Sequence, residues 1–147
     1  MEKLVVVENP EKWGLAAEDI RIASPSEYIN VEEYQEAKGL RVINLCKSYQ
    51  YQSLGYYVSL LAEARRHKVL PGVTTIQDLR FPSILREDSQ DFDNLIQNSF
   101  KDEKNDKAEF SIYFGITHQE NKQRLAGQLF QYIQAPVLRA VFTKRTK

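Results

Sequence analysis

A segment rich in hydroxyl and amide side chains lies near the middle of the chain, between an apolar run at 40–46 and a helical pattern at 55–67. The apolar run predicts a buried strand. In open α/β sheets, ligands bind where the carboxyl end of a strand leads into the N-terminus of a helix. Backbone N–H groups of the first helical turn lack partners there, and the helix dipole favours an anion. The order of these features predicts a site for a carboxylate or a phosphate.

The residues of this candidate site come from the end of the strand, the polar segment and the start of the helix. We expect them to line a concavity at the carboxyl edge of the sheet: Asn44, Lys47, Ser48, Tyr49, Gln52, Ser53, Gly55 and Tyr56. Alternatives remain open for several of them. Ser53 could act only as a helix cap, and Tyr49 could only pack against the core. For Tyr56 and Tyr57, burial is the favoured interpretation, because apolar stripes on helices usually face inward.

Groups that could carry out catalysis are sparse. Cys46, the single cysteine, is interpreted as a buried small hydrophobe rather than a nucleophile, because no base is adjacent to it. His67 is interpreted as a complement to a helix dipole at the end of the helix, and His118 as a surface residue. Glycine-rich phosphate-binding motifs, H-E-x-x-H and EF-hand spacings do not occur. We therefore expect no catalytic residue and no metal site in this chain.

Length and charge limit the class of protein. A chain of 147 residues has the size of one domain. Its formal net charge is zero, which argues against a nucleic-acid binder that relies on counterion release. No apolar segment is long enough to span a membrane, and the beginning of the chain does not resemble a signal peptide. We expect a cytoplasmic protein that binds neither nucleic acid nor a membrane.

Apolar runs and helix signals alternate along the chain. Strands are predicted at 4–7, 20–23, 40–45, 110–116 and 137–142, with a short strand or turn at 69–72. Helices are predicted at 24–38, with an interruption near residue 30, and at 55–67, 84–100 and 117–135, with a further helix start at Thr75. This alternation predicts an α/β fold: a single domain with a mostly parallel open sheet and helices on both faces.

Local patterns also predict helix ends and helix faces. Ser24 and Glu27 have the spacing of a capping box, and Thr117 and Glu120 have the same spacing. The face of the 55–67 helix that we expect to be buried consists of Tyr57, Leu60, Leu61 and Ala64. The corresponding face of the last helix consists of Leu125, Leu129, Tyr132 and Ile133.

A long string within the chain has a family resemblance. The string is SYQYQSLGYYVSLLAEA, followed by TTIQDL. Together with the beginning, LVVVENPEKW, and the end, FSIYFGITHQENKQRLAGQLFQYIQAPVLRAVF, it resembles the N-terminal domain found ahead of RimK-like ATP-grasp ligases. The resemblance covers nearly the whole chain. It departs at Arg66, where a glycine is common, and at Gly72, where a serine is common, and these departures affect only loop geometry.

The resemblance implies a domain that precedes a ligase, one that uses ATP to join a carboxylate to an amine through an acyl phosphate. ATP and Mg²⁺ are implied only for the ATP-grasp catalytic domain, which these residues do not contain and which would be a partner in cis or in trans. The implied role of this chain is non-catalytic: a scaffold that recognises an amino-acid or peptide substrate. The alternative is an interaction module that docks a ligase domain or self-associates. An independent enzyme is the least favoured hypothesis, because no nucleophile–base pair or metal cluster is found.

Overall fold

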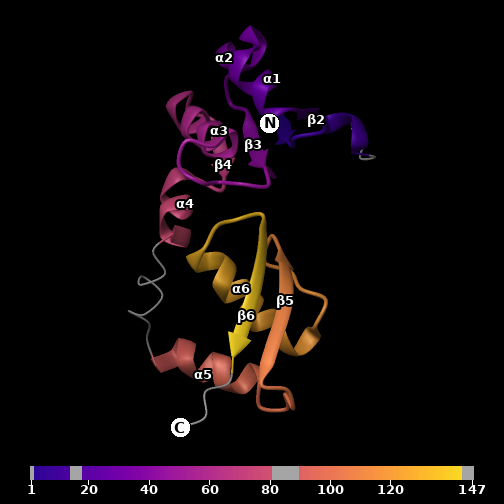
Figure 1. Ribbon diagram of the computed structural model, residues 1–147, viewed down its shortest axis with the longest axis vertical. Coiled ribbons are helices and arrows are strands. Elements are labelled where there is room, and N and C mark those ends of the chain that lie inside the picture. Colours follow the sequence, from indigo (N-terminus) through magenta and orange to yellow (C-terminus); the bar gives the residue numbers. More distant parts are fainter. Residues whose placement is uncertain (1, 14–17, 81–89, 144–147) are drawn as a thin grey trace. The chain divides into compact units, whose positions relative to one another are not determined.

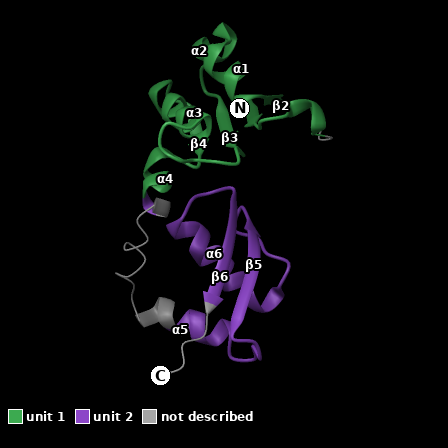
Figure 2. Cartoon of the chain, viewed as in Figure 1, with its two compact units in different colours: residues 1–77 green, residues 78–147 purple. Residues whose placement is uncertain are grey.

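The computed structural model describes residues 2–13, 18–80 and 90–143. The chain divides into two compact units, residues 1–77 and 78–147 (Figures 1 and 2). Each unit has its own sheet and its own cluster of buried apolar side chains. The α/β fold class is confirmed, whereas the assignment of both units to a single domain stays a prediction. Among the described residues, no helix is long and apolar enough to cross a membrane.

Unit 1 contains a four-stranded parallel sheet. Its strands are β1 (Lys3–Val6), β2 (Ile20–Ala23), β3 (Arg41–Asn44) and β4 (Lys68–Leu70), in the order β2-β1-β3-β4. All three strand pairs are parallel, which confirms the prediction of a mostly parallel sheet. Burial is greatest in the central strand β1, where Leu4, Val5 and Val6 are buried, whereas the edge strands β2 and β4 are mostly half-buried.

Helices α1 (Pro25–Asn30), α2 (Glu32–Glu36) and α3 (Leu54–Ala64) follow the second and third strands. The connections from β2 to β3 and from β3 to β4 run in the same direction across the sheet, so the right-handed crossover rule puts α1 and α3 on one face. Their mutual contacts agree with this placement. The connection from β1 to β2 runs the opposite way, which puts the turn η1 (Pro10–Lys12) on the other face.

The core of unit 1 lies between the sheet and helices α1 and α3. It consists of Leu4, Val6, Ala23, Tyr28, Tyr34, Leu40, Val42, Cys46, Val58 and Ala62. The predicted capping box at the start of α1 is confirmed, because the Glu27 N–H donates to Ser24 Oγ at 3.1 Å and the Ser24 N–H donates to Glu27 Oε1 at 3.2 Å.

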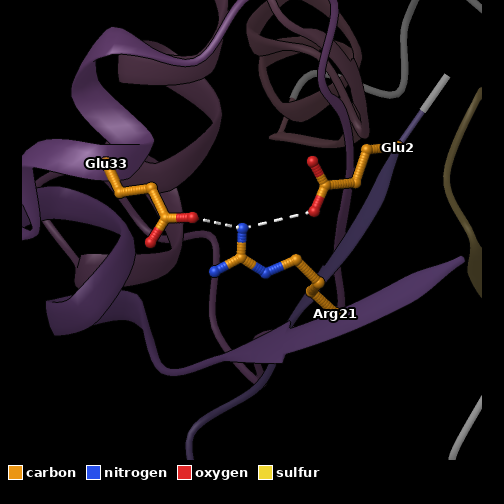
Figure 3. Close-up of polar contacts among 3 residues, drawn as sticks. All are labelled: Glu2, Arg21 and Glu33. Carbon is orange, nitrogen blue, oxygen red and sulfur yellow. Dashed lines mark hydrogen bonds and ion pairs between the residues drawn. The ribbon is translucent and has the colours of Figure 1, made fainter. Parts of the chain in front are cut away.

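An ion-pair triad covers the outer end of this core at the edge strand β2. Arg21 Nη1 lies 2.7 Å from Glu33 Oε1 and 3.2 Å from Glu2 Oε1. Figure 3 shows the guanidinium between the two carboxylates. The guanidinium also lies 5.1 Å from the centre of the Tyr34 ring. Its hydrogen bond lowers the pKa of the Glu33 carboxyl below the ordinary value. A charged side chain on the helix-covered side of an edge strand discourages pairing with another chain.

The buried face of α3 differs from the predicted one. Its buried residues are Gly55, Val58, Ser59 and Ala62. Tyr57 and Leu60 are instead 37% and 39% exposed. The physical reason is side-chain size. Small side chains on the buried face let the helix approach the sheet closely, and the larger residues Tyr57 and Leu60 face outward.

Unit 2 contains helix α5 (Gln90–Ser99), strand β5 (Lys107–Tyr113), the turn η3 (Glu120–Lys122), helix α6 (Gln123–Tyr132) and strand β6 (Val137–Thr143). Strands β5 and β6 form a two-stranded antiparallel sheet, so they do not extend the parallel sheet of unit 1. The core of this unit consists of Phe110, Ile112, Leu125, Ala126 and Leu129. Of the face predicted for α6, Leu125 and Leu129 are buried, whereas Tyr132 is 41% exposed.

Two predicted helix starts are wrong. Thr117 and Glu120 form no capping box, because the Thr117 N–H donates instead to Gln123 Oε1 at 3.0 Å and α6 begins at Gln123. Helix α4 (Val73–Arg80) begins two residues before Thr75. There the Val73 N–H donates to Glu63 Oε1 at 2.9 Å, so a carboxylate from α3 satisfies a free amide of α4. Both starts depend on partners that the local spacing does not reveal.

Candidate functional site

The segment after β3 lies at the point where the strand connections diverge. The connection after β1 leads to β2 on one side, and the connection after β3 leads to β4 on the other. Ligand crevices of open α/β sheets form at such a switch point, outside the carboxyl ends of the strands. The Lys47 N–H donates to Glu8 Oε1 at 2.6 Å, which joins the segments that follow the two strands. The predicted location of the loop, beside the start of α3, is therefore confirmed.

Asn44 lies at the end of β3, and its side chain makes three hydrogen bonds within unit 1. Asn44 is fully buried. Its Nδ2 donates to Gly55 O at 2.8 Å and to Ser59 Oγ at 2.9 Å, and its Oδ1 accepts from the Cys46 N–H at 3.2 Å. The Ser59 hydroxyl then donates to Pro71 O at 2.7 Å. This network connects β3, α3 and the segment after β4, so the carboxamide acts as a structural link.

Tyr49 also turns toward the protein. Its hydroxyl donates to Asn44 O, and its ring packs against the core of unit 1. Burial, together with the nearby Cys46 and Glu8, raises the pKa of the phenol well above its ordinary value. The phenol therefore stays protonated as a donor to the end of β3. A ligand that accepts a hydrogen bond from the Tyr49 hydroxyl or the Asn44 amide would have to displace these internal bonds, and a ligand role for the two residues stays a prediction.

Ser48, Ser53 and Gly55 shape the entry to α3. The Tyr56 N–H donates to Ser53 Oγ at 3.2 Å, and the Ser53 hydroxyl donates to Ser48 O at 3.2 Å, so Ser53 is the N-cap of α3. A Cβ built on Gly55 would lie 2.0 Å from Ser48 O. The glycine thus permits a close approach of the loop backbone to the helix. In the structure, these three residues fix the connection between the loop and α3. Their contact with a ligand stays a prediction.

We expect Ser53→Ala to lower the free energy of unfolding by about 1 kcal/mol, because one amide of the first turn of α3 loses its acceptor. Chemical denaturation of the purified chain would measure this change. Ser26→Ala is a matched control, since Ser26 is exposed and lies within α1 rather than at its cap. A change below a few tenths of a kcal/mol for Ser53→Ala would contradict the capping role.

The remaining candidate residues face solvent. Lys47, Ser48 and Gln52 are exposed, and Gln52 has a left-handed backbone with φ 70°. Tyr56 is partly buried, and its ring lies between the rings of Tyr51 and Tyr57, with centroid distances of 5.4 Å and 5.8 Å. The loop therefore presents a lysine, two polar side chains and a group of aromatic rings to the outside.

Cys46 is buried, as the sequence predicted. It is 5% exposed, and burial, with a smaller effect of Glu8, raises the pKa of its thiol to about 12. The thiolate is the reactive form, so a thiol with this pKa stays protonated and inert at neutral pH.

We expect the Cys46 thiol of the native chain to react with a disulfide reagent at pH 8 far more slowly than the unfolded chain, by at least about a hundredfold, because both burial and the raised pKa oppose attack. Absorbance after addition of the reagent, with and without urea, measures both rates. Because the chain has a single cysteine, the signal has one source. Comparable native and unfolded rates would contradict this prediction.

His67 is buried instead of lying exposed at the end of α3, so its interpretation as a complement to the helix dipole is wrong. His67 is 4% exposed. Its Nε2 lies 2.7 Å from Ala37 O, which can only accept, so Nε2 donates. In the neutral ring, Nδ1 then accepts from the Tyr28 hydroxyl at 2.7 Å. Arg65 lies over the Tyr28 ring and donates to Tyr28 O at 2.7 Å, which completes a structural cluster.

An exposed apolar surface lies beside the loop. We call the α3 surface the set formed by Tyr51, Leu54, Tyr57 and Leu60, which are 61%, 53%, 37% and 39% exposed. The last three recur at every third position along α3. Tyr57 and Leu60 belong to the stripe for which the sequence predicts burial, whereas Leu54 does not. The signal that separates the two stripes is residue size, because Gly55, Ser59 and Ala62 suit the closer contact.

Comparisons with known proteins give one family match. The model of the RimK-like ATPgrasp N-terminal domain matches residues 25–147. The match includes α3 and both strands of unit 2, and it begins after β2. The resemblance noted at LVVVENPEKW lies outside it. No curated protein and no solved structure showed significant similarity to the chain.

Proposed function

Because this chain belongs to the RimK-like ATPgrasp N-terminal domain family, we propose that it is a non-catalytic scaffolding and recognition domain that docks the ATP-grasp catalytic domain of an ATP-dependent carboxylate–amine ligase. The catalytic domain, in cis or in trans, would bind ATP and Mg²⁺. The substrate of such a ligase would be an amino acid or a peptide. Membership of this family supports an association with a ligase, and the docking role is the part of the proposal that the geometry supports best.

The observation that carries the docking proposal is the α3 surface. It combines two tyrosines with two leucines, and Tyr51 and Leu54 are each more than half exposed. Grouped apolar side chains on a surface mark interaction sites, and tyrosine is enriched among the residues that contribute most to binding. The rings of Tyr51 and Tyr57 already contact the ring of Tyr56, so they lose little conformational freedom when a partner covers them. The ATP-grasp domain is the occupant that the family supplies.

A second candidate function is recognition of a substrate carboxylate at the loop itself. The exposed Lys47 side chain supports it, together with the position of the loop at the switch point of the sheet. The internal bonds of Asn44 and Tyr49 reduce the number of side chains available for this role. NMR titration with amino acids and short peptides would test it, because a site at the loop requires shifts of amides within residues 44–57.

The docking proposal is tested with Leu54→Asp and Tyr57→Asp. Each variant should weaken binding of the chain to the ATP-grasp domain by at least about tenfold, because each places a charge at the centre of a desolvated contact. Calorimetric titration of the two purified partners measures the dissociation constant. Leu54 is the first residue of α3, where the helix dipole interacts favourably with an acidic side chain. Leu54→Asp should therefore not lower the stability of the fold.

Val31→Asp is the matched control, because Val31 is 39% exposed and lies on a different part of unit 1. It should change the dissociation constant by less than about twofold. Equal losses for Val31→Asp and Leu54→Asp, or no measurable binding of the unaltered chain, would overturn the proposal. Sedimentation of the chain alone tests the alternative: a dimer that Leu54→Asp dissociates would show that the α3 surface joins two copies.

A further inference from the structure

A groove in unit 2 contains polar groups that the docking role does not use. It lies between α5 and the start of α6 and encloses about 540 Å³. Its lining consists of Asn94, Leu95, Asn98, Ser99, Glu120, Asn121 and Arg124. We infer that this groove binds the free α-carboxylate of an amino acid or a short peptide through Arg124, with Glu120 receiving the ammonium group and the asparagines contacting the main chain.

Ser99 donates its hydroxyl proton to Leu95 O at 2.8 Å, whereas the other polar side chains of this groove are free to bind a ligand. In the described part of unit 2, the side chains of Glu120, Asn121, Arg124, Asn94 and Asn98 make no hydrogen bond or ion pair with the protein. A guanidinium with free N–H groups can hold a carboxylate through two parallel hydrogen bonds. Asparagine side chains both donate and accept, so they can match the N–H and C=O groups of a peptide.

The charges of the groove favour a zwitterion. Arg124 contributes one positive charge and Glu120 one negative charge, so a ligand with both a carboxylate and an ammonium group can satisfy each. A polyanion such as a nucleoside triphosphate would instead be repelled by the Glu120 carboxylate.

The neighbouring lysine does not contribute to this charge balance. Lys122 is 3% exposed, and its Nζ lies 3.4 Å from Glu103 Oε2 and 5.2 Å from the centre of the Phe100 ring. Its charge is therefore directed into the interior of unit 2 and is partly compensated there. Arg124, in the first turn of α6, is thus the cation available to a ligand in the groove.

The groove proposal rests on the proposed function, because the groove would be the place where the ligase recognises its substrate. The residues that carry it differ from those of the docking proposal. The α3 surface belongs to unit 1 and the groove to unit 2. Loss of docking in Leu54→Asp therefore leaves the groove proposal standing, and loss of ligand binding in a groove variant leaves docking standing.

The test is a titration of the intact, isotope-labelled chain followed by amide NMR. The probes are tri-alanine, its C-terminal amide, its N-acetyl derivative and free L-alanine. Tri-alanine should shift amides within 94–99 and 119–125 and saturate at millimolar concentration. The C-terminal amide and the Arg124→Gln variant should each bind at least about tenfold more weakly, because each removes one half of the same charge-assisted pair. The N-acetyl derivative should bind the unaltered chain more weakly than tri-alanine does. The Glu120→Gln variant should bind the two peptides with equal affinity, because the partner of the ammonium group is already absent.

Arg41→Gln is the matched control, because Arg41 is exposed in unit 1 and its loss changes the net charge equally. It should leave tri-alanine binding unchanged. Binding of free L-alanine with similar affinity would identify the ligand as an amino acid, and binding of tri-alanine alone would identify it as a peptide end. Equal affinity for tri-alanine and its amide, shifts outside the groove, or an equal loss in Arg41→Gln would each overturn the proposal.

Discussion

Asn44→Ala should lower the free energy of unfolding by about 3 kcal/mol or more, because the substitution removes three internal hydrogen bonds at a fully buried position. The backbone groups Gly55 O and the Cys46 N–H lose their side-chain partner. The Cys46 N–H, left buried without an acceptor, costs about 1–3 kcal/mol, and the hydrogen bonds that Gly55 O and Ser59 Oγ lose, at about 1 kcal/mol each, account for the rest of the expected effect. Urea-induced unfolding followed by circular dichroism would measure it.

Two further variants test whether the loss of stability comes from the hydrogen-bond network or only from the change at a buried position. Ser59→Ala should cost less than Asn44→Ala, since it removes one acceptor of Asn44 and one donor to Pro71 O. The double variant should cost less than the sum of the two, because the residues share a hydrogen bond. Asn30→Ala, at an exposed position, is the control and should change stability by less than about 0.5 kcal/mol. A small effect of Asn44→Ala would show that the network does not stabilise unit 1.

Features with local causes could be predicted from the sequence. The Ser24–Glu27 capping box needs only residues three positions apart, and it forms as expected. The strands β1 and β3 lie within short apolar runs, and burial on both sides of the parallel sheet removes the polar alternation in β1. The position of the polar loop follows from the same rules, since a parallel strand that leads into a helix carries its loop at the carboxyl edge.

Features that depend on distant partners could not be predicted. The antiparallel pairing of β5 and β6 depends on how the chain returns between them, and an apolar run looks the same in either direction. Glu63 holds the start of α4, and Gln123 replaces Thr117 as the polar link at the start of α6. Each of these bonds joins residues that no short motif connects.

Within the candidate site, the sequence gives residue types but not the direction of each side chain. Tyr49 and Asn44 are polar residues at a strand end, which is compatible with ligand binding or with internal bonding. The structure shows the internal bonds, because Asn44 O and the Tyr49 hydroxyl lie within hydrogen-bonding distance of each other. The two stripes of α3 raise the same difficulty, and steric contact at Gly55 decides which of them faces the sheet.

That contact leads to the second large effect: Gly55→Ala should lower the free energy of unfolding by about 3 kcal/mol or more. A Cβ at position 55 would lie 2.0 Å from Ser48 O and 2.9 Å from Cys46 Cβ, so the loop or the helix must move. Helix propensity alone predicts the opposite sign, because alanine is favoured over glycine within a helix by about 1 kcal/mol.

Gly127→Ala supplies the matched control in α6, where a Cβ would meet nothing within 4 Å. It should raise stability by up to about 1 kcal/mol. Denaturant unfolding of both variants therefore gives changes of opposite sign if the close approach at Gly55 holds α3 in place. If Gly55→Ala raised stability instead, the result would show that the loop backbone at Ser48 can move away from the added Cβ at little cost. The face that α3 presents to the sheet would then depend on the apolar contacts of Val58 and Ala62 rather than on the backbone contact at its start.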